Sequence, residues 1–342
     1  SRRHGARWTL AGDATRPRVS AVRQSGALPP YEVVANVSEG RDEAVLAAFT
    51  AVVAGSPGVQ LLDMHRDPDH DRSVYTYVGE ADALALATRA LARIAIATID
   101  LTAAAKSGAR RGVHPRIGAI DVIPLIPLGP GGSEHGAVVA ARALGRTLAA
   151  DLNLPVHFYG AVARNEARRA LPEIRRGGFE ALAERQRDPD GEPDEGPIAP
   201  HPTGGAVAVG VRPLMAAWNI QLTGAAEEKL ATAARAIARS MRGSAPRGIP
   251  GLQALGFRLP SVKSAQLSMN LHNVVASSSA GITLHSIRAR AEEEARLLEV
   301  QIGDSEIVGL VPESALRAGG DPNALKIRGG WQRASIESRF AR

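Results

Sequence analysis

Hydrophobic and polar positions in the first half of the chain follow the order strand, helix, strand, strand, helix, strand, helix, strand. Short β-branched and aromatic stretches predict the strands, and Ala- and Leu-rich stretches with helical spacing predict the helices. The predicted strands are 31–37, 60–63, 72–79, 119–128 and 156–159. The first predicted helix follows the turn 38–41 and ends near residue 53, and the other two are 81–101 and 133–152. Ser38 is the expected N-cap of the first helix, and Pro124 and Pro127 favour an edge position or an irregular end for their strand.

The second half repeats this order after a loop. Between 185 and 205 the composition changes to Asp, Glu, Pro and Gly, which marks the boundary between two lobes. Strands are predicted at 214–222, 252–259, 265–272 and 305–311, and helices at 225–241 and 282–298. A βαββαβ unit folds as a sheet with helices on one face. We therefore predict an α/β (α+β) protein with two ferredoxin-like βαββαβ-type subdomains, whose sheets face each other and whose helices lie outside.

The length of 342 residues also favours two lobes, because single hydrophobic cores stop growing at about 250 to 300 residues. The predicted division is a disordered basic extension at 1–29, a first subdomain at 30–185, a linker loop at 186–205, a second subdomain at 206–320 and a tail at 321–342.

Positive charge is concentrated at the N-terminus. The formal net charge is +6, and residues 1–29 carry six arginines against one aspartate, which leaves +1 for the rest of the chain. The charge therefore does not indicate a nucleic-acid partner. A transit-like segment, a processed end and an upstream start-site extension all fit the composition of 1–29.

The absence of cysteine excludes disulfides, thiolate metal sites and a cysteine nucleophile. No apolar stretch reaches the roughly 18 residues that a membrane-spanning helix needs, and the first residues lack the apolar region of a signal peptide. We expect a cytoplasmic protein without a membrane partner.

His114 is the first candidate for chemistry. It precedes Pro115 in the loop before the strand 119–128, and Pro115 keeps the His114 backbone out of the helical region. A restrained imidazole at the start of a strand is suited to catalysis. The alternative is that His114 only bonds a neighbouring backbone carbonyl.

Two other stretches carry weaker signals. His65 and the segment 67–72, with two His among three Asp, invite a metal site, but they lack a fixed ligand spacing, and Asp-Pro-Asp is common in turns. The glycines at 204, 205 and 210 resemble a phosphate loop, yet no helix opens after them and the Lys-Ser/Thr signature is missing, so a flexible hinge remains open.

These stretches resemble successive motifs of the glutamate formimidoyltransferase family. The matching segments are Asn36-Val37-Ser38-Glu39-Gly40-Arg41, Asp71-Arg72-Ser73-Val74-Tyr75-Thr76, the run from His114-Pro115-Arg116 to Pro127, Pro155 to Gly160, Arg169 to Pro172, Ile174-Arg175, Gly205-Ala206, Gly210, Arg212, Asn219, Gln266, Ser268, Asn270-Leu271 and Val308 to Pro312. They occur in order over about residues 31 to 316.

The resemblance implies two facing subdomains in a homodimer, with folate between them. It implies tetrahydrofolate as co-substrate, N-formimidoyl-L-glutamate as the donor, no metal and a place in histidine degradation. It assigns catalysis to His114. Folate contacts are assigned to Gly196, Pro197, Ile198, Ala199, Pro200, His201, Pro202, Thr203, Gly204 and Gly205. Animal members also carry a cyclodeaminase domain, and we expect none here.

In the implied reaction, N5 of tetrahydrofolate attacks the formimidoyl carbon and glutamate leaves, so protons must move near neutral pH. A histidine suits this role because its ordinary pKa is near 6.5. Asp121 is a candidate to orient the imidazole, or else a solvated strand end. Arg72, Arg116 and Arg212 are candidates to bind carboxylates with two hydrogen bonds each, and Asn219 is a supporting candidate.

Three positions depart from the family pattern. Asp71 replaces an expected Asn, Ala161 an expected Glu, and Thr203-Gly204 the Ser-Trp of animal members. Two alternatives therefore stay open: a non-catalytic folate-binding homologue, and transfer of formyl rather than formimidoyl groups.

Overall fold

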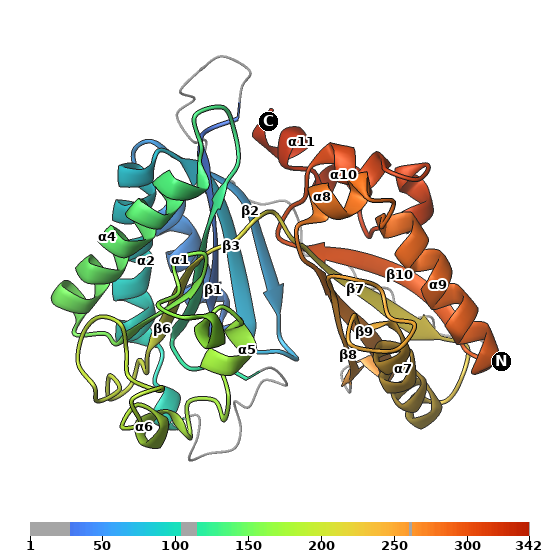
Figure 1. Ribbon diagram of the computed structural model, residues 1–342, viewed down its shortest axis with the longest axis horizontal. Helices are drawn as coiled ribbons and strands as arrows, with labels where there is room; N and C mark the ends of the chain where they lie inside the picture. The colour runs from blue at the N-terminus through green and yellow to red at the C-terminus, as the bar shows by residue number, and fades with distance from the viewer. Residues whose placement is uncertain (1–27, 104–114, 260–261, 342) are drawn as a thin grey trace.

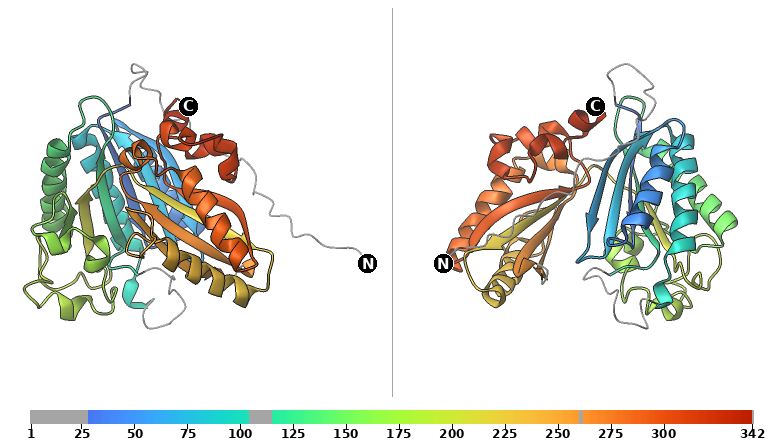
Figure 2. Two further views of the ribbon diagram at one scale, coloured as in Figure 1. Left: turned by 45° about the vertical axis from the view of Figure 1, so that its right-hand side comes forward. Right: turned by 180° about the vertical axis from the view of Figure 1, so that it is seen from behind.

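The computed structural model describes residues 28–103, 115–259 and 262–341, so most of the basic extension lies outside the described residues. The described chain forms two lobes, each built on one β-sheet with its long helices on one face (Figure 1). In the first lobe, two short helices that include Ile174 and Leu182 pack against part of the other face. The sheets have six and four strands. Figure 2 shows from two further directions that the helices lie outside and the sheets lie between them. The predicted fold class is confirmed.

The first lobe is a ferredoxin-like unit extended by two strands. Its strands are β1 (Tyr31–Val37), β2 (Val59–Asp67), β3 (Arg72–Gly79), β4 (Ile120–Pro127), β5 (Val156–Gly160) and β6 (Val207–Val211), and its helices are α1 (Glu43–Ala54), α2 (Ala81–Thr98), α4 (Glu134–Leu152), η1 (Glu166–Arg168), α5 (Leu171–Ile174) and α6 (Leu182–Arg185). The sheet order is β2-β3-β1-β4-β6-β5. The first four strands are antiparallel neighbours, and β6 runs parallel to both β4 and β5.

Alternation along β1 separates the core from the opposite face. Val33, Ala35 and Val37 are fully buried in the core, with Phe49 of α1 and Leu91 of α2. The residues between them point to the other side of the sheet, because successive strand side chains alternate. The β1 residues that alternate with this core set therefore lie on the face of the first sheet opposite α1 and α2.

The first helix begins later than expected. Asp42 is the N-cap of α1 and accepts hydrogen bonds from the backbone N–H groups of Ala44 and Val45. Ser38 instead donates its hydroxyl hydrogen to the carbonyl oxygen of Gly118 at 2.7 Å. The prediction of Ser38 as N-cap was wrong because this hydroxyl serves a tertiary contact.

The expected edge position of β4 was also wrong. β4 lies inside the sheet, between β1 and β6. Its register with β1 pairs Val33 with Leu125 and Asn36 with Val122 and leaves out Ile123 and Pro124, of which Pro124 has no N–H to donate. The sheet thus accommodates an internal proline where the β1–β4 ladder is interrupted, while Pro124 still pairs with Gly210 of β6.

The strand β6 was not predicted, and we placed residues 206–211 in the second subdomain. β6 pairs with β4 and β5, so these residues complete the first sheet. The short glycine- and alanine-containing run 206–211 lacked the alternation that indicates a strand, because this strand is fully buried on both faces. The chain passes to the second sheet between Val211 and Ala216.

The second lobe has the ferredoxin-like order β10-β7-β9-β8, with antiparallel neighbours. Its elements are β7 (Ala216–Thr223), α7 (Glu227–Met241), β8 (Leu252–Leu259), β9 (Ser264–Leu271), α8 (Val274–Ser279), α9 (Leu284–Leu297), β10 (Gln301–Val308), α10 (Glu313–Arg317), η3 (Pro322–Leu325), η4 (Trp331–Ala334) and α11 (Ile336–Phe340). Trp218 and Ile220 pack with Ile237 of α7 and Ile287 of α9 in its core.

The C-terminal helix returns to the first lobe. Arg339 of α11 forms an ion pair with Asp63 of β2, and the Gln60 side-chain amide donates to the carbonyl oxygen of Phe340 at 3.2 Å. Ile336 packs in a small cluster with residues of β2 and β3. The two lobes are therefore joined at β2 as well as by the connection from β6 to β7. Among the described residues, no helix combines the length and apolar character that a membrane span requires.

Candidate active site

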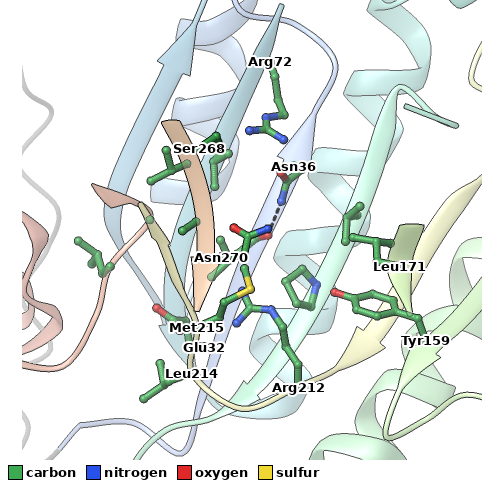
Figure 3. A pocket seen from close by; sticks show the side chains of 18 of the residues that line it. Glu32, Asn36, Arg72, Tyr159, Leu171, Arg212, Leu214, Met215, Ser268 and Asn270 are labelled. Atoms are coloured by element: carbon green, nitrogen blue, oxygen red, sulfur yellow. Dashed lines mark hydrogen bonds between the residues drawn. The ribbon is translucent and has the colours of Figure 1, made fainter. Parts of the chain in front are cut away.

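A crevice lies between the two facing sheets. Both sheets and the segments beside them contribute its polar lining, which consists of Glu32, Asn36, Arg72, Tyr159, Arg175, Arg212, Asn219, Ser268 and Asn270. Figure 3 shows side chains of both lobes directed into this common space. The site is thus formed by the strand faces that the helices leave uncovered.

Strand alternation explains the first-lobe wall. Glu32, Val34 and Asn36 of β1 line the crevice, whereas the residues between them belong to the core. The β1–β4 register changes after Asn36, which pairs with Val122, while Val37 pairs with Ile120. Asp121 is the additional residue of this bulge, and bulges of this kind redirect side chains.

Arg72 and Arg175 form one positive part of the crevice. Burial and the positive charge of Arg175 lower the pKa of Arg72 to about 10, against the opposing effect of Asp121. Arg175 forms an ion pair with the Asp121 carboxylate, which also accepts the Ile117 N–H at 2.8 Å. Arg72 therefore stays a cation at neutral pH, while the charge of Arg175 is largely compensated.

Arg212 and Glu32 form the other charged part. Arg212 follows β6 and donates from Nη1 to the carbonyl oxygen of Pro213 at 3.0 Å. Glu32 is 1% exposed, and burial raises its pKa to about 8, although the charge of Arg212 acts in the opposite direction. Below pH 8, the Glu32 carboxyl is mainly neutral.

The second-lobe wall is uncharged but polar. Asn219 of β7 stands opposite Ser268 of β9, and Asn270 is two residues further along β9. The Asn219 amide donates to the Glu306 carboxylate at 3.1 Å. Amide side chains both donate and accept hydrogen bonds, so this wall can orient a ligand that the arginines attract.

Sequence segments that resemble family motifs meet at one end of the first sheet. The carboxylate of Asp71 accepts the Gly40 N–H at 3.3 Å and lies 3.7 Å from guanidinium nitrogens of both Arg41 and Arg116. Asp71 has a φ of 47°, a conformation in which Asn and Asp are enriched. The replacement of Asn by Asp therefore keeps the backbone and adds a negative charge between two arginines.

The structure separates the predicted arginines. Arg72 and Arg212 line the crevice, as does Asn219, whereas Arg116 pairs with Asp71 at the end of the sheet. His114 lies outside the described residues, so its role, and the orienting role predicted for Asp121, stay predictions. One carboxylate oxygen of Asp121 accepts the Ile117 N–H, and the other accepts a hydrogen bond from Arg175.

The predicted folate-contacting loop 196–205 lies beside the segment 117–119 and contributes no residue to the crevice lining. His201 and Gly205 exchange two backbone hydrogen bonds, and the Ala119 N–H donates to the Gly204 carbonyl at 2.9 Å. Gly118 pairs with Gly205, and a Cβ at Gly118 would lie 1.9 Å from the Ala206 carbonyl oxygen. The loop is therefore held against the segment that follows His114.

The Asp-rich segment at 67–71 is a turn. Asp67 accepts the backbone N–H groups of Asp69 and His70, each at 2.9 Å. The His70 ring contacts Phe257 of the second lobe, with ring centroids 5.3 Å apart. Among the described residues, no group of three or more His, Cys, Asp or Glu side chains is placed to hold a metal ion.

The two lobes correspond to two matches with known protein families. Residues 31–212 match the family model described as formiminotransferase domain, N-terminal subdomain, and residues 217–323 match the one described as formiminotransferase domain. The chain belongs to the formiminotransferase family. The two matches divide the chain between β6 and β7, where the structure passes from one sheet to the other.

Relatives of two lengths resemble this chain. Formimidoyltransferase-cyclodeaminase of Mus musculus is 35% identical over 285 residues, which are 83% of this chain and 50% of that protein. The chain thus spans about half the length of that relative. Glutamate formimidoyltransferase of Streptococcus pyogenes serotype M1 is 33% identical over 83% of this chain and 90% of its own length. That of Thermoplasma acidophilum is 34% identical over 83% and 89%.

Sequence reasoning missed two ionisable side chains that line the crevice. Glu32 was not considered, although its position in the alternation of β1, shared with Val34 and Asn36, placed it on the helix-free face. Arg175 was noted only as a motif residue, and its approach to Asp121 joins residues 54 positions apart. A pairing over that separation has no local sequence signal.

Proposed function

We propose that this chain is a glutamate formimidoyltransferase, which transfers the formimidoyl group of N-formimidoyl-L-glutamate to N5 of tetrahydrofolate and yields 5-formimidoyltetrahydrofolate and L-glutamate. The observation that carries the proposal is that both family matches coincide with the two lobes that enclose the arginine-lined crevice. The glutamate formimidoyltransferase of Streptococcus pyogenes serotype M1, matched over 90% of its length, supports the same assignment.

The residues of the crevice suit the charges of the two substrates. The donor and the folate tail carry carboxylates, and a guanidinium binds a carboxylate through two parallel hydrogen bonds. Arg72 and Arg212 line the crevice and are the proposed carboxylate ligands. The amides of Asn219 and Asn270 on the opposite wall would orient the bound groups. Arg116 would contribute indirectly, because its ion pair with Asp71 would hold the segment that follows His114 in place.

The proposed chemistry is group transfer with two proton movements. The N5–carbon bond forms while the π pair of the formimidoyl C=N bond moves to its nitrogen, and N5 loses a proton. The lone pair on the formimidoyl nitrogen then re-forms the C=N bond as the carbon–nitrogen bond to glutamate breaks. The electron pair of the broken bond leaves on the glutamate nitrogen, which gains a proton. His114 would accept the first proton and donate the second, a role worth about 10² to 10⁴ in rate. Proton transfer of this kind requires no metal ion.

The crevice would also contribute proximity. Both substrates must reach the same space between the lobes, and holding two reactants in register removes much of the entropic cost of their encounter. We assign folate contacts to 196–205, which is hydrogen-bonded to the segment after His114. We further propose that the enzyme is a cytoplasmic homodimer that acts in histidine degradation. Light scattering of the purified chain tests whether it is a dimer.

The decisive experiment is an assay with tetrahydrofolate and either N-formimidoyl-L-glutamate or N-formyl-L-glutamate, followed by acidification to convert a 5-formimidoyl product to its absorbing methenyl form. We expect absorbance with the formimidoyl donor. Signal with the formyl donor alone would move the assignment to formyl transfer. Folate binding without product from either donor would make the chain a non-catalytic folate-binding homologue.

A further inference from the structure

Glu32 is an unusual carboxyl in the crevice. It lies on β1, the strand that pairs with both β3 and β4, and its side chain is among the crevice-lining groups. It supplies the one carboxyl group among the described crevice-lining residues, and its Oε1 atom is buried without a hydrogen-bond partner in the described structure. Figure 3 shows Glu32 at the end of the crevice where Arg212 and Met215 also lie.

A buried carboxyl of this kind has a cost that a ligand can offset. A polar atom without a hydrogen-bond partner loses its contacts with water and gains nothing in return, which destabilises the folded chain. Arg212 favours the ionised form of Glu32, but burial has the larger effect. A cationic ligand that supplies N–H groups would remove both the penalty and the obstacle to ionisation.

The donor of the proposed function carries such a group. Its formimidoyl nitrogen is part of an amidine, which is a planar cation near neutral pH with N–H groups arranged like those of a guanidinium. A carboxylate receives two parallel hydrogen bonds from a group of this shape. A formyl group is neutral and presents a carbonyl oxygen, which an ionised carboxylate repels.

We propose that the Glu32 carboxylate binds the amidinium of the formimidoyl donor and thereby selects this donor over its N-formyl counterpart. The inference rests on the proposed function and assigns the choice of one-carbon group to one side chain. Arg72 and Arg212 would bind the carboxylates that both donors share, so they do not discriminate between them. A retained proton on the amidine also keeps its carbon electrophilic towards N5.

Binding of the amidinium should release a proton from Glu32. With a pKa of about 8, free Glu32 is mostly protonated at pH 7, and pairing with a cation ionises it. Two other groups that line the crevice have shifted pKa values. Arg72 has a pKa of about 10, and burial raises the pKa of Tyr159 above its ordinary value. Burial and Arg212 lower the pKa of His272, which keeps it neutral at pH 7.

The test compares the wild type with Glu32→Gln, which keeps the shape of the neutral acid and removes its ability to ionise. Calorimetric titrations at pH 7 with N-formimidoyl-L-glutamate and with N-formyl-L-glutamate, in two buffers of different ionisation heat, give the affinities and the number of protons released. We expect Glu32→Gln to weaken formimidoyl donor binding at least thirtyfold and to abolish proton release. Binding of the formyl donor should change by less than threefold.

Two further variants control this experiment. Glu184→Gln, at an exposed position of α6, should behave as the wild type in every titration. Glu32→Asp retains a carboxylate with shorter reach and should recover part of both the preference and the proton release. Thermal unfolding of each variant separates a loss of binding from a loss of folding.

The outcomes distinguish this inference from the proposed function. Turnover of the formimidoyl donor together with an unchanged donor preference in Glu32→Gln would overturn the role of Glu32 and leave the function standing. Binding with proton release but no turnover by the wild type would support Glu32 and overturn the function. Equal loss of both donors in Glu32→Gln, or no binding of the formimidoyl donor by the wild type, would overturn the inference.

Discussion

His114 precedes Pro115 in the sequence, so its backbone is biased towards an extended conformation whatever ligand is bound. The described segment that follows is fixed on two sides, since Arg116 pairs with Asp71 and Gly118 pairs with Gly205. The described residues Arg116 to Gly118 thus connect the His-Pro-Arg motif to the bulge at the start of β4.

Replacement of His114 by Ala should reduce turnover at least a hundredfold, since general acid–base catalysis contributes about 10² to 10⁴ in rate. Folate affinity and folding should stay close to those of the wild type, because the imidazole would act on protons more than on binding. Steady-state kinetics with tetrahydrofolate binding by fluorescence measures both. His135→Ala, at an exposed position of α4, is the control that should change neither. An unchanged rate in His114→Ala would end the assignment.

Glu32 should also make stability depend on pH. Its pKa is about 8 in the folded chain and 4.5 when unperturbed, so the folded state holds the proton more tightly between these values. Stability from this group is fully present below about pH 4.5 and is lost as the pH rises through 8, at about 1.4 kcal/mol per pH unit at most. Glu32→Gln removes this loss, so the variant should gain stability relative to the wild type between pH 5 and pH 8.

Urea unfolding at pH 5 and pH 8 measures this effect. We expect the free-energy difference between Glu32→Gln and the wild type to grow by about 1 to 3 kcal/mol over that interval. The same difference for Glu184→Gln should stay constant. A difference for Glu32→Gln that is equal at both pH values would show that folding does not raise the pKa of Glu32.

At the level of elements, the loop 196–205 approaches the segment before β4 most closely at a pair of glycines. The Gly118–Gly205 bridge requires close approach of two backbones, and a Cβ at Gly118 would meet the carbonyl oxygens of Ala206 and Ile120 at 1.9 and 2.8 Å. Backbone atoms in a sheet cannot move aside as a side-chain end can. Gly118→Ala should therefore destabilise the fold by about 2 to 4 kcal/mol, as overpacked positions do.

Gly131→Ala provides the comparison for Gly118→Ala. A Cβ at Gly131 would meet no atom within 4 Å, although its φ of +91° makes any other residue strained. Its cost should stay near 1 kcal/mol, which reflects backbone conformation alone. Denaturant unfolding of both variants gives the two costs. Equal costs would mean that the segment at Gly118 yields without loss of the bridge.

The elements differ in how far sequence predicts them. Periodicity found β1, β3 and both ferredoxin-like units, because the alternation of buried and exposed positions is a local signal. It missed β6, whose residues are all buried, and it misplaced β4 at an edge because Pro124 was assumed to end pairing. Whether Pro124 can remain unpaired in a ladder depends on the partner strand, so it cannot be predicted from the sequence of β4 alone.

The candidate site was predictable only in part for the same reason. Arg72, Arg212 and Asn219 were named from motif matches, and the structure brings them to one crevice. The pairing of Arg175 with Asp121 and the isolation of Glu32 arise from tertiary packing between distant segments. Such burial changes the pKa of a side chain, and neither the burial nor its neighbours are encoded near that residue in the sequence.

For the whole molecule, the crevice exists only while the two lobes keep their relative position. The chain crosses once between β6 and β7, and α11 returns from the second lobe to β2. Ile336 is fully buried there in a cluster with Leu62, Val78 and Leu310, and Leu310 also lines the crevice. The packing of α11 thus couples the C-terminal segment to the ligand-binding space.

Ile336→Ala should loosen this coupling, and Ile287→Ala, at a fully buried position in the core of the second lobe, is its matched control. Both variants remove the same atoms from a buried site and should lose about 2 to 5 kcal/mol of stability. Only Ile336→Ala should also weaken donor and folate binding, by about fivefold or more, because part of the lost packing free energy holds the lobes together. Calorimetric titration of the two variants at a temperature where both are folded measures this difference. If both variants bind the two substrates with equal affinity, α11 does not control the crevice, and the connection between β6 and β7 must position the lobes without its help.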